Sequence, residues 1–173
     1  MILVAVGANL SDRHGASPVV TCRAAAEALR SLPGLRVVAL SQWYRTAPVP
    51  PSGQPDSCNG PDFCMGPDFC NGIVRLDGHP DPAWLLGRLH MIEARAGRVR
   101  TVANAPRVLD LDLIECNETV SDGPVLLPHP RAHERGFVLY PLRDVAPDWV
   151  HPVFGLSVAT LINDLAAQRV EPI

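Results

Sequence analysis

Two aspartates in residues 106–114 are the strongest chemical signal in the chain. This segment reads Pro-Arg-Val-Leu-Asp-Leu-Asp-Leu-Ile. Successive side chains of a strand point to opposite faces, so the pattern places Asp110 and Asp112 on one face and the intervening leucines in a core on the other. Carboxylates at this spacing lie roughly 7 Å apart and repel each other unless a cation lies between them. The pair therefore suits magnesium, whereas a bare Asp-x-Asp also fits an edge strand with a solvated polar face.

The basic residues concentrate just before the aspartate pair. All 15 are arginines, so no lysine is available to hold a phosphate, and the net charge of −3 argues against a general nucleic-acid-binding protein. Residues 88–107 contain a single acid, Glu93, and five of the arginines: Arg88, Arg95, Arg98, Arg100 and Arg107. Any anion must therefore be held by guanidinium groups, histidines, backbone amides or a metal.

Length and composition limit the class of protein. A chain of 173 residues with 47% hydrophobic content predicts one domain over residues 1–173, with a lengthened loop at 47–72. No apolar run approaches ~20 residues, so we expect a cytoplasmic protein without a membrane partner. The five cysteines are expected to be free thiols.

The elements that must position these residues follow from apolar periodicity and helix-boundary signals. Residues 2–6, 35–44 and 73–76 are predicted strands, in addition to the aspartate strand. Ser17 and Asp81, each followed by proline, are predicted to begin helices that end before residues 33 and 97. This order predicts an α/β (α+β) fold, a ferredoxin-like βαββαβ sandwich. Further helices are predicted at 138–145 and 156–168.

Residues 55–72 hold three tandem hexads. They read Pro-Asp-Ser-Cys-Asn-Gly, Pro-Asp-Phe-Cys-Met-Gly and Pro-Asp-Phe-Cys-Asn-Gly. One interpretation is a metal site formed by Cys58, Cys64 and Cys70, although the spacing lacks the close pairs of a zinc site. The other is a duplication that lengthened a surface loop, which costs little because loop-closure entropy rises slowly with length.

Seven short motifs occur in order along nearly the whole chain. They are Gly7-Ala-Asn-Leu10, Tyr44-Arg-Thr46, Pro67-Asp-Phe-Cys-Asn71, Ile92-Glu93 with Gly97-Arg-Val-Arg100, Pro106-Arg-Val-Leu-Asp-Leu-Asp112, Leu127-Pro-His129 and Arg135-Gly-Phe137. Together they resemble the 6-hydroxymethyl-7,8-dihydropterin pyrophosphokinase family of folate biosynthesis. The resemblance implies a ferredoxin-like enzyme that transfers pyrophosphate from ATP to the pterin's hydroxymethyl oxygen and releases AMP.

The resemblance also implies residue roles. Two magnesium ions would be held by Asp110 and Asp112. Catalysis would involve Arg98, Arg100 and Arg107. ATP would be bound by Glu93, His90, Arg98, Arg107, His129 and Arg135. The pterin would be bound by Thr46, Val49, Phe69, Asn71 and Phe137.

The chain departs from the family pattern in three places. Ala103 and Asn104 replace a frequent Arg-Trp pair expected to close over the substrates, and Pro130 replaces a frequent tyrosine. In the hexads, Asn59 shares the Asp-x-Cys-Asn context of Asn71. We prefer Asn71 for pterin recognition because a phenylalanine lies two residues before it and a predicted strand follows it.

Three functions remain open on this reading. The first is an ATP-dependent pterin pyrophosphokinase, expected to be a monomer with ATP and 6-hydroxymethyl-7,8-dihydropterin as its ligands and with no nucleic-acid partner. The second is a related nucleotide transferase acting on another heterocyclic alcohol. The third is a catalytically silent nucleotide- and pterin-binding protein of the same fold.

Overall fold

A six-stranded sheet forms the centre of the described part of the molecule. The computed structural model describes residues 1–48, 67–98 and 106–173. The strands are β1 (Ile2–Ala8), β2 (Arg36–Leu40), β3 (Tyr44–Thr46), β4 (Phe69–Asp77), β5 (Asp110–Cys116) and β6 (Val170–Pro172). They run in the order β5-β1-β4-β3-β6, with β2 also pairing with β4, and every pair is antiparallel.

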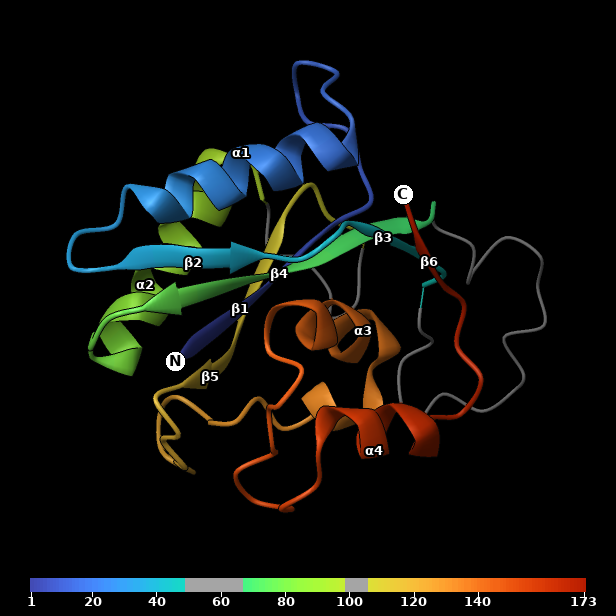
Figure 1. Cartoon of the computed structure of the whole chain (residues 1–173). Coiled ribbons are helices and arrows are strands. Elements are labelled where there is room, and N and C mark those ends of the chain that lie inside the picture. The colour runs from blue at the N-terminus through green and yellow to red at the C-terminus, as the bar shows by residue number, and fades with distance from the viewer. Residues whose placement is uncertain (49–66, 99–105) are drawn as a thin grey trace.

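Helices cover both faces of this sheet (Figure 1). They are α1 (Pro18–Arg30), α2 (Pro82–Arg95), α3 (Gly136–Val145) and α4 (Val158–Asp164), with a short 3-10 helix η1 (Ala132–Glu134). In the view of Figure 1, α1 lies above the sheet and α3 and α4 lie below it, and α2 packs on the same core as α1. Within the described ranges no helix combines the length and apolarity needed to cross a membrane.

The predicted ferredoxin-like arrangement is confirmed. The predicted units correspond to β1, α1, β2, β4, α2 and β5, and their strands lie in the sheet order β5-β1-β4-β2. Both proline-led helices begin where predicted. The Asp81 carboxylate accepts a hydrogen bond from Trp84 N–H at 2.8 Å, whereas Ser17 occupies the N-cap without a side-chain bond.

Two strand predictions need correction, and one strand was not predicted. The predicted strand at 35–44 is two strands, β2 and β3, separated by a break in which Ser41 Oγ accepts the Ile73 N–H at 2.9 Å. β4 begins at Phe69 rather than at residue 73, because a polar and glycine-containing start hides its alternation. β6 was not predicted, since three residues ending in Glu-Pro carry no strand signal. The C-terminal helix is also shorter than predicted.

Two apolar cores occupy the two faces of the sheet. Val4, Val6 and Leu111 belong to the core beneath α1 and α2. Leu3 and Ile73 belong to the core beneath α3 and α4. Alternation along each strand separates these sets, as side chains of successive strand residues must point to opposite faces.

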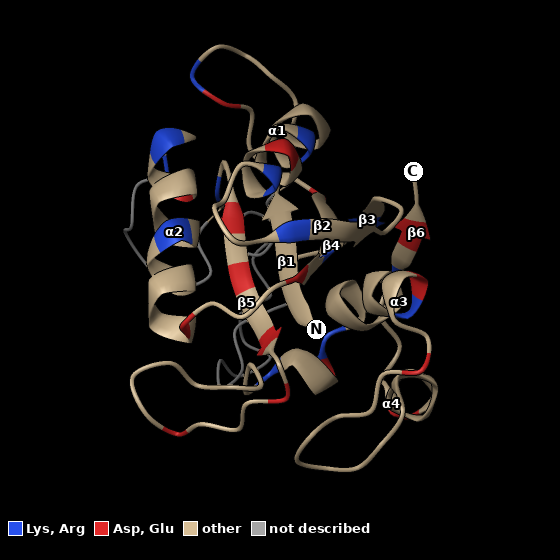
Figure 2. Cartoon of the chain, turned by 60° about the vertical axis from the view of Figure 1, so that its left-hand side comes forward, with Lys and Arg blue, Asp and Glu red and all other residues tan. Residues whose placement is uncertain are grey.

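The aspartates lie on the face that carries α3. In the register with β1, Asp110 is opposite Gly7 and Asp112 is opposite Ala5. The register then shifts, so that Glu115 is opposite Leu3 and the alternation of β5 changes phase. The predicted division of this segment into a leucine face and an aspartate face is therefore confirmed. Figure 2 shows the acidic positions spaced along β5.

Glu115 is a carboxylate inside the second core. It is 1% exposed, and Trp149 Nε1 donates a hydrogen bond to its Oε2. Its Oε1 has no hydrogen-bond partner among the described residues. Burial raises the pKa of Glu115, because a low-dielectric environment disfavours the charged form.

Glu115→Gln is expected to stabilise the protein at neutral pH. Because the folded-state pKa is raised, Glu115 contributes most favourably below its unfolded pKa and loses that contribution as the pH rises through the folded value. Glutamine mimics the protonated acid and does not titrate. The variant should match the parent near pH 4 and gain about 1 kcal/mol in unfolding free energy at pH 8. Urea unfolding at both pH values tests this, and a gain that is independent of pH would contradict it.

Candidate active site

A basin opens where β1, β4 and β5 meet the segment before α3. Its walls contain predicted residues from four separate parts of the chain: Thr46, Phe69, Asn71, Arg107, Asp110, Asp112, His129, Arg135 and Phe137. Gly7, Ala47, Pro48 and Arg131 complete the lining. The predicted metal ligands and the predicted pterin-binding residues therefore share one cavity, which we call the basin.

Gly7 forms the part of the floor between these two groups. It is opposite Asp110 on one side and opposite Asn71 on the other. A Cβ at this position would lie 2.8 Å from Asn71 Oδ1, closer than real Cβ atoms approach. The missing side chain thus keeps the space between the aspartate and the asparagine open.

Arginines neutralise Asp110 from two directions. Arg98 and Arg107 each donate to one of its carboxylate oxygens. Arg98 also pairs with Glu93, which is 1% exposed and whose Oε1 accepts the Leu111 N–H at 2.8 Å. Glu93 is thus anchored to the backbone of β5 and holds Arg98 beside Asp110. Arg98 is not itself a lining residue of the basin, but this pairing holds its guanidinium against Asp110, which is one.

Asp112 is less well neutralised than Asp110. Its nearest cation in an ion pair is Arg135, whose Nη1 lies 3.9 Å from Oδ2. Burial and the neighbouring Asp110 raise the pKa of Asp112 to about 6, against the opposing effect of Arg135. At neutral pH Asp112 is therefore largely ionised beside Asp110, and a cation between the two carboxylates would relieve their repulsion.

The donor set of the aspartate pair fits a hard divalent cation. Carboxylate oxygens are preferred magnesium ligands, and Mg²⁺ usually keeps waters and substrate phosphates in its shell. Among the described residues, no group of three or more His, Cys, Asp or Glu side chains could hold an ion alone. A cation at Asp110 and Asp112 would thus take its other ligands from phosphate oxygens and water.

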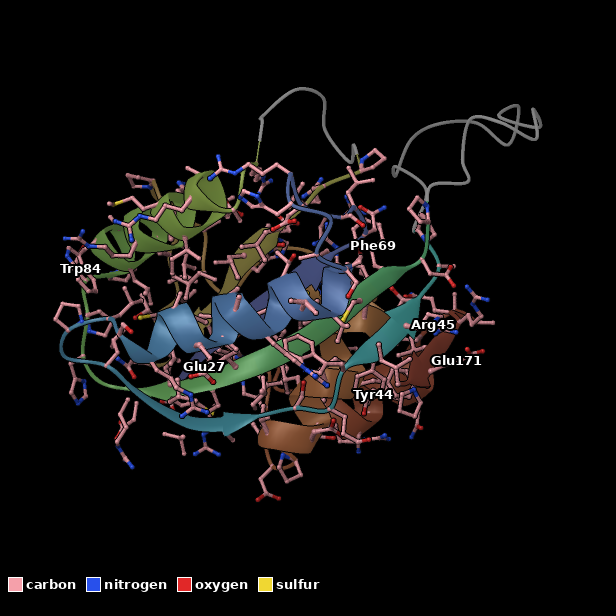
Figure 3. The ribbon with its side chains drawn as sticks, turned by 90° about the horizontal axis from the view of Figure 1, so that it is seen from above. Glu27, Tyr44, Arg45, Phe69, Trp84 and Glu171 are labelled. Carbon is pink, nitrogen blue, oxygen red and sulfur yellow. The ribbon has the colours of Figure 1, made fainter. Side chains whose placement is uncertain are left out.

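The opposite side of the basin has an amide and two aromatic rings. Asn71 Nδ2 donates to Thr46 Oγ1 at 2.8 Å, and both residues are buried. This bond fixes the amide orientation. Phe69 lies at the start of β4 (Figure 3), and the Phe137 ring lies 5.4 Å from the Arg135 guanidinium carbon. A flat heterocycle could stack on these rings and present its edge to the amide.

His129 is held as a neutral hydrogen-bond donor. Its Nδ1 accepts the Arg131 N–H at 3.1 Å. Burial, aided by the charge of Arg135, lowers the pKa of His129 to about 4. In the neutral ring the proton must then lie on Nε2, where it can be donated to a phosphate oxygen.

Comparison with known proteins identifies the family. A model of the family described as 7,8-dihydro-6-hydroxymethylpterin-pyrophosphokinase matches residues 3–147. The chain belongs to this pyrophosphokinase family. A 2-amino-4-hydroxy-6-hydroxymethyldihydropteridine pyrophosphokinase of Pseudomonas aeruginosa is 40% identical over 148 residues, covering 85% of this chain and 81% of the relative. The enzyme of the same name from Methylorubrum extorquens is 38% identical over 146 residues, covering 84% and 82%.

Solved structures support the same fold. A crystal structure of Plasmodium falciparum HPPK-DHPS (A437G with STZ-DHP) has a TM-score of 0.64 at 14% sequence identity. The match covers 94% of this chain and 44% of that chain. At 14% identity this likeness concerns the fold alone. The shared fold agrees with the family to which the chain belongs.

Some predicted site residues lie outside the basin or outside the described residues. His90 is exposed on α2, whereas Glu93, on the same helix, is buried. Their predicted roles in ATP binding stay predictions. Val49, Arg100, Cys58, Asn59, Cys64, Ala103 and Asn104 fall outside the described residues. Cys70 is buried, and Cys22 Sγ lies 3.6 Å from its carbonyl oxygen.

Some residues at the site of the pyrophosphokinase have no role predicted from the sequence. Besides Gly7 and Arg131, these include Asn9, which is 3% exposed. Asn9 Oδ1 accepts the Arg107 N–H at 2.8 Å, and its Nδ2 donates to the Pro67 carbonyl at 3.1 Å. Asn9 thereby links the segment before β4 to the segment before β5. The position of Asn9 directly after a buried strand could have predicted this role, because polar side chains at such positions often form hydrogen bonds with loop backbone groups.

Proposed function

We propose that the basin is the active site in which this pyrophosphokinase binds ATP with magnesium and 6-hydroxymethyl-7,8-dihydropterin. Its family transfers pyrophosphate from ATP to the pterin hydroxymethyl group, in folate biosynthesis. The supporting observation is that Gly7 separates Asp110 from Asn71 on one open floor. A diphosphate near the aspartates and a pterin near the asparagine could therefore meet above this glycine.

The aspartates would hold the metal in this assignment. Asp110 and Asp112 are the proposed ligands, and two magnesium ions are proposed between them and the ATP phosphates. Bound magnesium would neutralise phosphate charge and stabilise the attacking and leaving oxygens. Arg98 and Arg107 already pair with Asp110, so they lie where phosphate oxygens could join the same network.

The remaining cations and donors would orient the phosphate chain. Arg135 lies beside Asp112, and His129 offers a neutral N–H. Phosphoryl-type transfer needs positioning and charge neutralisation more than a protein nucleophile. The hydroxymethyl oxygen then attacks the β-phosphorus while AMP leaves. From the family resemblance we also propose that Arg100 takes part in catalysis and that Glu93 and His90 bind ATP.

The amide side of the basin would recognise the pterin. The Asn71 amide, fixed by Thr46, presents both donor and acceptor capacity. Phe69 and Phe137 would stack on the ring, and Val49 is proposed to line the same space. We also propose a monomer that works as one domain in the cytoplasm.

A nucleotide assay tests the reaction. The protein is incubated with ATP, magnesium and 6-hydroxymethyl-7,8-dihydropterin, and AMP is resolved from ADP, with the pterin omitted as control. We expect AMP and the pterin diphosphate to form in equal amounts and only when pterin is present. ADP would indicate ordinary phosphoryl transfer, and tight binding of both ligands without turnover would favour a silent binding protein.

A further inference from the structure

Arg131 differs from the other arginines of the basin in its lack of an acidic partner. Arg107 pairs with Asp110, and Arg135 lies near Asp112. Arg131 also lines the basin, yet no carboxylate of the described residues lies within ion-pair distance of it. Its guanidinium could therefore bind a ligand anion without first giving up an ion pair.

Arg131 lies close to two other lining residues of the basin, His129 and Arg135. Burial and the charge of Arg135 lower the pKa of His129 most, and Arg131 lowers it further. The three side chains are thus close enough to interact, and all three line the same basin. The two like charges of Arg131 and Arg135 repel each other unless an anion lies between them, and the neutral His129 offers an N–H to the same anion.

The local backbone fixes where Arg131 lies. Its N–H donates to His129 Nδ1 at 3.1 Å, and Ala132 N–H donates to the His129 carbonyl at 3.0 Å. The 3-10 helix η1 follows immediately. Neither bond uses the side chain of Arg131, so a change of that side chain leaves the turn and the histidine orientation intact.

We propose that Arg131 binds the diphosphate group that is transferred from ATP, together with Arg135 and His129. The inference rests on the proposed function of the basin. The transferred group must lie between the aspartate pair and the pterin, and Arg131 lines the cavity that holds both. A guanidinium suits this role because its planar fork can contact two phosphate oxygens at once. The same contact would persist to the pterin diphosphate product.

Binding measurements separate this role from a structural one. Calorimetry with magnesium, and without pterin so that no turnover occurs, compares ATP, inorganic pyrophosphate and AMP. For Arg131→Gln we expect the Kd of ATP and of pyrophosphate to rise about tenfold or more, and that of AMP to change less than about twofold. Arg131→Lys should recover part of the loss, because the charge returns without the fork.

A matched control uses an arginine away from the basin. Arg143 lies on α3 with its guanidinium carbon 5.3 Å from the Tyr140 ring centre, and Arg143→Gln should leave all three Kd values unchanged. Equal weakening of ATP and AMP, or unchanged ATP affinity in Arg131→Gln, would overturn the proposal. Failure of the proposed function is distinguishable, since the parent protein would then form no pterin-dependent AMP.

Discussion

Asp112→Asn is expected to reduce pterin-dependent AMP formation by about a thousandfold or more. Asparagine keeps the size of the side chain but removes the negative charge that a magnesium ion requires. Asp112 lies on the α3 face of β5, close to Arg135 and opposite Ala5, so the substitution removes no core contact. The measurement is the rate of AMP release at saturating ATP, magnesium and pterin.

Stability measurements show whether the loss is chemical. Burial raises the pKa of Asp112, so removing its charge should leave the melting temperature unchanged or slightly higher. Asp110→Asn should lose activity as well, but with lower stability, because Arg98 and Arg107 both donate to that carboxylate. Asp148→Asn, an exposed aspartate outside the basin, serves as control. Near-normal AMP release by Asp112→Asn would refute the metal-ligand assignment.

Asn71→Ala should weaken pterin binding by about 10- to 100-fold, the loss expected for hydrogen bonds left unmade in a buried site. The amide is buried in β4, is held by Thr46 and lies beside the open floor at Gly7. Alanine removes the groups that would read the pterin edge and leaves the aspartate side intact. Pterin titration by fluorescence gives the Kd, and ATP affinity should stay within about twofold.

The duplicated hexad supplies the control for this variant. Asn59 has the same Asp-x-Cys-Asn context as Asn71, so Asn59→Ala tests whether the local sequence alone is enough. We expect it to bind pterin as the parent does. If Asn59→Ala weakened binding more than Asn71→Ala, the pterin-binding asparagine would have to be reassigned to the earlier hexad. Melting temperatures for both variants exclude unfolding as the cause.

Local patterns predicted the parts of this protein that depend on spacing between near neighbours. The alternation in residues 106–114 identified the leucine face and the aspartate face of β5, because side-chain direction repeats every two residues. Proline after Ser17 and Asp81 identified the starts of α1 and α2. The family motifs added the residues that line the basin. All of these signals lie within short segments.

The tertiary structure decided what depends on distant segments meeting. Only strand pairing places Gly7 between Asp110 and Asn71, and only packing buries Glu93 against β5 while His90, on the same helix, stays exposed. The turn at His129 positions Arg131. Arg131 is left without an acidic partner among the described residues because the acids of the basin lie beside other arginines. Such relations arise from contacts between residues far apart in the chain, which the periodicity of one segment does not encode.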